Sequence, residues 1–258
     1  MRYINENNNN PIDFFLRDPH NKIKVVDLKL DMKVQMEYFA FLSAAAREYG
    51  SGESSMEALM ERAFDAGAPP DERKRILAWL SCSEEVEALR ALEQYEKSCP
   101  EEMKGFVAIC VYQCRTGIES MLLDERHAVV VSGMGGKDDK IRYFAALMTL
   151  SGQPWTTTEQ HLLREELVLT SKEHDAVVEV LEFSGKYAKM LFLIPITLPP
   201  ITVVRSAKNA SNELGVFISP QEVITNVSRL SDEELDKIFS GEEWQPPLPF
   251  LDFDSAPD

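Results

Sequence analysis

Apolar and polar positions in the first half of the chain repeat with the period of an amphipathic helix. From Asp31 to Tyr49 the apolar residues recur at steps of three and four, and the pattern stops at Gly50. Four similar segments follow before residue 125. They are the stretch after Ser54, DERKRILAWL after Pro69 and Pro70, SEEVEALRALEQYEK, and EEMKGFVAICVYQCRTGIESMLL. The pattern therefore predicts about five helices over residues 1–125.

The connections between these segments are short, and short connections favour antiparallel neighbouring helices. Ser54 and Glu57 match the capping box Ser-x-x-Glu at the start of the second segment. The stretch from Asp71 to Cys114 also resembles HEAT-type repeats, since amphipathic helices of similar length follow one another there. We therefore expect either a helical bundle or a short helical-repeat-like unit.

After Asp124 the hydrophobic pattern becomes typical of strands. HAVVVSG and KIRYFAALMTL flank a glycine cluster and predict a hairpin. Thr156 and Glu159 form a capping box that opens a helix over TTTEQHLLREELVLTSKE. AVVEVLEF and YAKMLFLIP predict a second hairpin, which turns at Gly185 and Lys186. The sequence thus predicts an antiparallel α+β domain with two hairpins around one helix.

The remaining segments are less regular. SAKNASNELG predicts a polar loop after ITVVR, and VFISPQEVITNV fits either a strand or a short helix. Ser231 and Glu234 cap a last helix over SDEELDKIF. The end of the chain, rich in acidic residues, proline and aromatics, predicts no regular element. We expect an α+β protein with an all-α domain over residues 1–125, an α+β domain over 126–240 and a tail over 241–258.

Composition indicates a folded chain without a membrane span. The 44% hydrophobic content of the 258 residues is enough to build a core. The first residues lack the basic start and apolar run of a signal peptide, and the most apolar segment, Met190 to Val204, holds three prolines. We expect a cytoplasmic protein that has no membrane partner.

Net charge argues against broad contact with nucleic acid, because that contact depends on clustered Lys and Arg. The formal charge of the chain is −16. It is distributed unevenly: residues 1–125 carry 15 basic and 23 acidic side chains, residues 126–230 carry 11 of each, and residues 231–258 carry 1 and 9. The middle segment is locally neutral, so a basic spot there remains compatible with the sequence.

The glycine-rich stretch SGMGGKDDK is one candidate site. Clustered backbone N–H groups and a lysine can hold a phosphate, but the sequence matches neither the Walker pattern nor the dinucleotide pattern. A hairpin loop with glycines at positive φ explains the same residues. The candidate ligand-binding residues are Gly133, Gly135, Gly136, Lys137, Lys140 and Arg142.

Three other features of the sequence are candidates for a metal, catalytic or DNA-binding site. Cys110 and Cys114 lie one helical turn apart and could hold a soft metal, but a buried helix face accounts for them better, so we expect no metal and no cofactor. His161 and Glu165 lie one turn apart without a neighbouring nucleophile. A helix followed by a hairpin also fits a DNA-binding winged helix, but the acidic residues of the helix count against it.

The tail offers aromatic anchors for a partner. Trp244, Phe250 and Phe253 alternate with acidic residues and prolines, as in an extended recognition peptide. From the sequence we therefore expect a non-catalytic binding or scaffold protein whose partner is another protein and not nucleic acid. The alternative is a small enzyme or sensor that binds a nucleotide or phosphate at the Gly133 to Lys137 loop.

Overall fold

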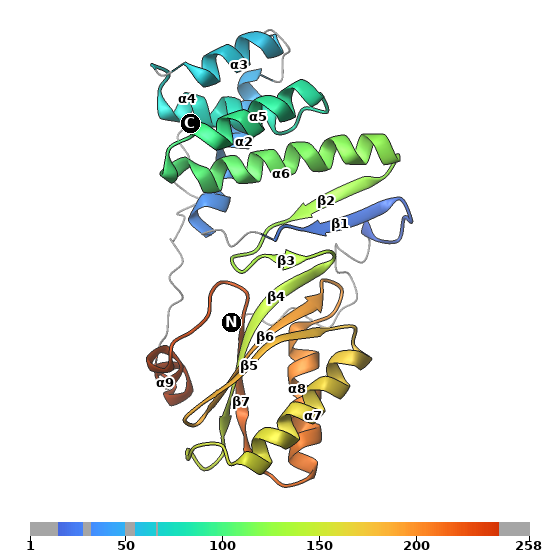
Figure 1. Cartoon of the computed structure of the whole chain (residues 1–258), viewed down its shortest axis with the longest axis vertical. Coiled ribbons are helices and arrows are strands. Elements are labelled where there is room, and N and C mark those ends of the chain that lie inside the picture. The colour runs from blue at the N-terminus through green and yellow to red at the C-terminus, as the bar shows by residue number, and fades with distance from the viewer. Residues whose placement is uncertain (1–14, 28–31, 50–54, 66, 243–258) are drawn as a thin grey trace.

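The computed structural model describes residues 15–27, 32–49, 55–65 and 67–242 (Figure 1). Helices α2 to α6 form one end of the molecule, and a sheet with three helices forms the other. The predicted α+β class is confirmed. The predicted domain boundaries stay a prediction, and the tail from residue 243 onward lies outside the described residues.

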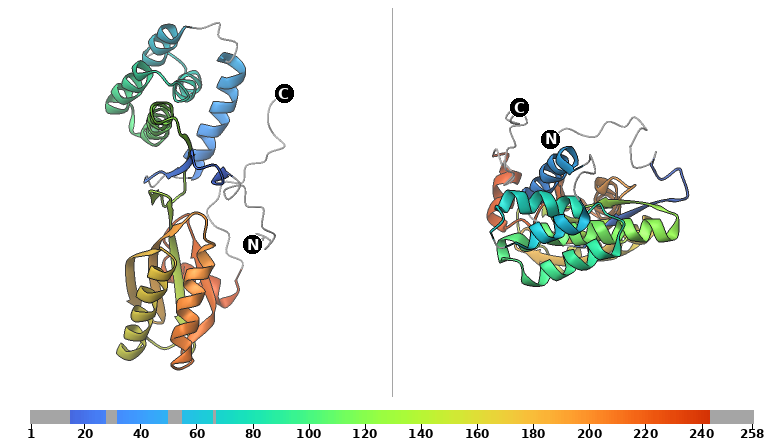
Figure 2. Two further views of the ribbon diagram at one scale, coloured as in Figure 1. Left: turned by 90° about the vertical axis from the view of Figure 1, so that its right-hand side faces the viewer. Right: turned by 90° about the horizontal axis from the view of Figure 1, so that it is seen from above.

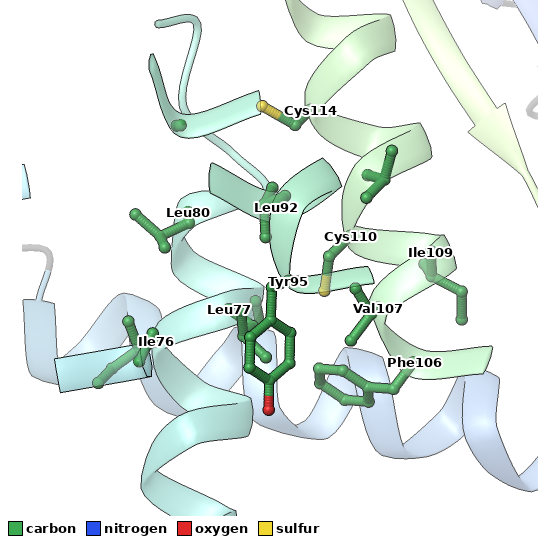
Figure 3. Close-up of a cluster of buried hydrophobic side chains, with 14 of the residues drawn as sticks. Ile76, Leu77, Leu80, Leu92, Tyr95, Phe106, Val107, Ile109, Cys110 and Cys114 are labelled. Carbon is green, nitrogen blue, oxygen red and sulfur yellow. The ribbon is translucent and has the colours of Figure 1, made fainter. Parts of the chain in front are cut away.

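In its described residues the N-terminal part contains five helices, as the hydrophobic pattern predicted. They are α2 (Met32–Tyr49), α3 (Met56–Phe64), α4 (Pro70–Leu80), α5 (Val86–Ser98) and α6 (Glu101–Leu123). Their apolar faces meet in one cluster, in which Leu92 and Cys110 are fully buried (Figure 3). The N-cap of α3 is Ser55, whose side chain accepts a hydrogen bond from the amide of Ala58. The predicted Ser54 cap was therefore one residue too early, and Ser54 itself lies outside the described residues.

Helix α6 is the core helix of this part. It is long and apolar enough to span a membrane by length and composition. Its side chains Phe106, Val107 and Cys114 are, however, buried within the helical cluster. Such burial is typical of a helix in a protein core.

A small parallel sheet lies between the helices and the larger sheet (Figure 1). Strand β1 (Asn21–Val25) pairs with β2 (Arg126–Val130), although about a hundred residues separate them. The amide of Val25 also donates to the Asp138 carbonyl, at 2.8 Å. The predicted hairpin between HAVVVSG and KIRYFAALMTL is therefore wrong, because β2 takes β1 as its partner. Strand β1 was not predicted from the sequence.

The larger sheet is antiparallel and carries most of the C-terminal part. Its elements are β3 (Gly136–Lys137), β4 (Lys140–Thr149), α7 (Thr157–Glu173), β5 (Val177–Ser184), β6 (Tyr187–Pro195), α8 (Pro200–Glu213) and β7 (Ile218–Thr225). The strand order is β7-β4-β6-β5, with β3 following β7 along the same edge of β4. From β4 onward the chain thus runs βαββαβ, which is the split βαβ or ferredoxin-like arrangement.

The sequence predicted this sheet in part. The Thr156 capping box is present, and so is the β5–β6 hairpin, where Gly185 takes a φ of 54°. The segment around Ile218 is a strand, which settles the alternative left open. Helix α8 occupies the stretch expected to be a polar loop; Pro200 at its first turn and the buried Val203, Val204 and Ala207 were the signal.

The two faces of the sheet are covered differently. Helices α7 and α8 lie side by side on one face, where Leu163, Val204 and Phe192 share a core (Figure 2). The last helix, α9 (Asp232–Ser240), lies on the opposite face (Figure 1). Its predicted capping box, Ser231 with Glu234, is present. Because α9 is only nine residues long, part of that face stays uncovered.

We expect Leu92→Ala to lower the free energy of unfolding by about 2 to 5 kcal/mol, because it removes a fully buried side chain from the helical core. Urea titration followed by circular dichroism measures the change. Leu122→Ala is the matched control, since Leu122 is 72% exposed. The control should stay within about 0.5 kcal/mol of wild type. Equal losses in both variants would contradict the assignment of the core.

Candidate functional site

A groove lies on the uncovered part of the sheet face. It encloses about 560 Å³, within the range of roughly 300 to 1,000 Å³ that is usual for ligand sites. The floor is formed by Val180 on β5 and Leu191 on β6. The other lining residues are Asp27, Gly133, Met134, Arg142, Glu179, Val227, Ser228 and Arg229.

The walls of the groove are held together by close backbone contacts. A Cβ atom on Gly133 would lie 2.5 Å from the carbonyl oxygen of Val227, so only glycine lets the two segments approach. The amide of Met134 donates to the Asn226 carbonyl at 3.0 Å. On the other side of the loop, a Cβ on Gly136 would lie 2.2 Å from the Lys140 carbonyl oxygen. Close approach therefore explains both glycines.

The same loop offers few free amides to an anion. The amide of Gly135, where φ is 70°, donates to Ser132, and the amide of Gly136 donates to Val26. The hydroxyl of Ser132 in turn donates to the Gly135 carbonyl at 2.8 Å. The loop amides of Met134, Gly135 and Gly136 are thus all engaged with backbone carbonyls. A phosphate cradle made of these amides would first have to break those bonds.

Arg142 is the central charged group of the groove. Its guanidinium donates two hydrogen bonds to the Glu179 carboxylate, at 2.5 and 3.0 Å. Further bonds of 3.0 Å each reach Asp27 and the carbonyl of Met134. The hydrogen bonds to Glu179, followed by the one to Asp27, raise the pKa of Arg142 above its ordinary value. Arg142 therefore stays charged and fixes three chain segments around the groove.

A second, smaller cavity extends the groove along the sheet. It encloses about 160 Å³ and shares Val180, Leu191 and Arg229 with the first. Lys189 and Glu182 also line it. Arg229 is exposed, and no salt bridge joins it to any residue in the described part of the chain. The groove thus offers one unpaired guanidinium at its rim, whereas Arg142 is already neutralised.

The six predicted ligand residues do not all lie in one site. Gly133 and Arg142 line the groove, and Gly135 and Gly136 build its wall from behind. Lys137 is exposed on β3, outside the lining, and Lys140 binds Asp175 at 2.8 Å. The predicted partner-binding residues Trp244, Phe250 and Phe253 lie outside the described residues.

The other candidate groups lie away from the groove. His161 and Glu165 are exposed on α7, on the far side of the sheet. The β5–β6 hairpin forms the middle and edge of the sheet and not a wing beside a recognition helix, which removes the winged-helix alternative. Cys110 and Cys114 are buried thiols. No cluster of His, Cys, Asp or Glu in the described ranges could hold a metal ion.

The sequence did not single out Arg229, Glu179 or Asp27 as site residues. Glu179 lies where the β5–β6 register shifts, between Val178 and Val180. Arg229 follows β7 and reaches the groove only because the chain returns past Gly133. Neither feature has a local sequence signature.

No protein-family model matches the sequence, and no curated protein matches it. Among solved structures, a putative transposase from Deinococcus radiodurans is 15% identical, with a TM-score of 0.35, and covers 40% of this chain and 91% of its own. A REP-associated tyrosine transposase bound to a REP hairpin is 10% identical, with a TM-score of 0.30, and covers 39% of this chain and 68% of its own.

These comparisons contradict two of the expectations drawn from the sequence. A protein-protein scaffold and the absence of a nucleic-acid partner were expected, but these two structures are described as a putative transposase and a transposase bound to a REP hairpin. The net charge of −16 does not exclude a nucleic-acid partner, because a charge summed over the chain does not describe any one surface. At these TM-scores and identities, the likeness alone transfers neither an activity nor a site to this chain.

We expect Gly136→Ala to destabilise the protein by about 1 to 3 kcal/mol, because its Cβ would collide with the Lys140 backbone. Thermal unfolding followed by circular dichroism measures this change. Gly117→Ala in α6 is the control: its Cβ would meet nothing within 4 Å, so alanine should stabilise the helix by about 0.5 to 1 kcal/mol. A neutral Gly136→Ala would contradict the close packing of this loop.

Proposed function

We propose that the protein binds a short unpaired segment of nucleic acid in the groove of its βαββαβ sheet. The observation that carries the proposal is the groove itself, with an apolar floor on two strands and the exposed guanidinium of Arg229 at its rim. Proteins read unpaired nucleotides by laying bases on sheet surfaces and on guanidinium planes, and by pairing phosphates with cations.

The groove suits a base together with its phosphate. Val180 and Leu191 form an apolar surface on which a flat base can lie. Arg229 has no salt-bridge partner in the described ranges, so its guanidinium can donate hydrogen bonds to the phosphate at the rim. Gly133 and Arg142, which the sequence already suggested, would shape the wall and keep the glycine loop in place.

The acidic residues of the groove limit the expected strength of binding. Asp27 and Glu179 neutralise Arg142, and Glu182 lines the adjoining cavity. One or two phosphate contacts give a salt dependence with a slope of about −1 in log K against log salt, since each contact on a single strand contributes about −0.7. We therefore propose weak, local binding of unpaired nucleotides and no wrapping of a duplex.

The proposal includes two further expectations from the sequence, the cytoplasmic location and the division into domains. The four described cysteines are free thiols, which supports a reducing, cytoplasmic location. The division into residues 1–125, 126–240 and 241–258 gives the sheet domain the binding role. The helical domain would then be joined to the sheet domain through the paired strands β1 and β2.

We expect Arg229→Ala to weaken binding of a fluorescein-labelled hexathymidylate by about 5- to 10-fold, because it removes the cation that holds the phosphate. Fluorescence anisotropy at low salt measures the dissociation constant. Arg164→Ala, which removes an exposed charge from α7 on the other side of the sheet, is the matched control and should bind like wild type.

Two results would contradict the groove as the binding site. One is equal loss in the Arg229 and Arg164 variants, which would show non-specific charge attraction. The other is wild-type protein that binds no single strand at all at 20 mM salt, or binds a duplex of the same length as tightly.

A further inference from the structure

We propose that helix α9 is an acidic lid over a second half of the same binding face. The surface beneath it, formed by Phe144, Tyr187, Lys186 and Lys189, would bind further nucleotides of the strand once α9 moves away. The inference rests on the proposed function, because it assigns a longer track and its regulation to the same sheet face.

The first support is that the carboxylates of α9 occupy the cations of the sheet. Asp232 pairs with Lys189, and the Ser184 hydroxyl donates to it at 2.8 Å. One helical turn later, Asp236 pairs with Lys186 at 2.7 Å and accepts a hydrogen bond of 2.7 Å from the Tyr187 hydroxyl. Each lysine pairs with one of two carboxylates that lie one helical turn apart. The same two lysines can bind phosphate oxygens instead.

The pKa values of the two carboxylates agree with this pairing. The hydrogen bond from Lys189 holds the pKa of Asp232 below its ordinary value, and that from Lys186 does the same for Asp236. Both carboxylates are therefore ionised at neutral pH and compete directly with an anionic ligand for the lysines.

The second support is that the apolar face of α9 covers aromatic side chains of the two central strands. Leu235 is fully buried in a cluster with Phe144 on β4 and Tyr187 on β6. The ring of Phe239 lies 5.6 Å from that of Tyr187, tilted by 30°. Aromatic rings beside lysines on a sheet are the composition of a surface on which bases stack.

The third support is continuity between the covered half and the open groove. The smaller cavity is lined by Phe144 and Lys189, which belong to the covered half, and by Arg229, which belongs to the open half. Leu230, the last residue before the α9 capping box, also lines it. A strand bound at Arg229 would therefore run directly under the start of α9.

The fourth support is that α9 is attached in a way that permits release. It has nine residues, and no backbone hydrogen bond joins it to the sheet within the described ranges. Its ion pairs are partly exposed: the side chains of Lys186 and Asp236 are 35% and 55% accessible, and those of Lys189 and Asp232 are 18% and 43% accessible. Exposed ion pairs contribute little stability, and so short a helix is marginal alone.

The test removes the carboxylates while keeping their shape. In the full chain, Asp232→Asn with Asp236→Asn frees both lysines, and we expect labelled dodecathymidylate to bind about 10-fold more tightly, because the competent state becomes more populated. The matched control, Glu233→Gln with Glu242→Gln, changes the net charge equally at exposed positions that form no ion pair with Lys186 or Lys189, and should leave affinity unchanged.

Adding Lys186→Gln and Lys189→Gln to the Asn variant should abolish the gain, since the cations would be lost. Phe239→Ala is a second way to loosen the lid in the full chain and should raise affinity in the same direction. Circular dichroism confirms that each variant is folded before binding is measured.

The outcomes separate the lid from the groove. Wild-type binding that depends on Arg229, without a gain in the Asn variant or Phe239→Ala, would overturn the lid and leave the groove. A gain that depends on the lysines, in a protein whose wild type binds nothing, would support the lid and overturn the groove. A gain as large in the Glu233/Glu242 control would overturn the lid, and no binding by any variant would overturn both.

Discussion

The guanidinium of Arg142 is the constraint on which the rest of the C-terminal structure depends. It joins Asp27 after β1, the Met134 carbonyl in the glycine loop and Glu179 on β5. These three segments are far apart in the sequence, and one side chain joins them at the groove, beside the backbone contact of Gly133 with Val227. A rigid arginine fork suits this role, since its donors lie in fixed directions. Arg142 is thus a positioning residue, and the exposed Arg229 is left for a ligand.

The sheet gives the two faces different roles. The face under α7 and α8 forms a packed core, with Phe192, Leu163 and Val204 buried. The opposite face is divided between an open groove and a half that α9 covers. Two acidic residues of α9, Asp232 and Asp236, neutralise lysines of the covered half. The total charge of −16 therefore does not describe the charge of this face.

Much of the fold could be predicted because its signals are local. Helical periodicity placed α2 to α6, and the capping boxes at Thr156 and Ser231 placed two helix starts to the residue. The pairing of β2 with β1 could not be predicted, since five helices lie between the two strands in the sequence and no local pattern links them. Helix α8 was missed because polar residues dominate its second half, although its first turns bury Val203 and Val204.

The candidate site was predicted even less completely, for the same reason. Gly133 and Arg142 attracted attention as part of a glycine-rich loop, but the phosphate cradle that motivated them uses amides that the backbone has already engaged. Arg229 and the α9 carboxylates lie in other segments, which only the tertiary structure brings to the sheet. The most direct measurement is an amide NMR titration of the full chain with unlabelled hexathymidylate. Binding in the groove predicts shifts confined to residues 133–142, 179–191 and 227–230, whereas shifts centred on α2 to α6, or none at saturating ligand, would contradict it.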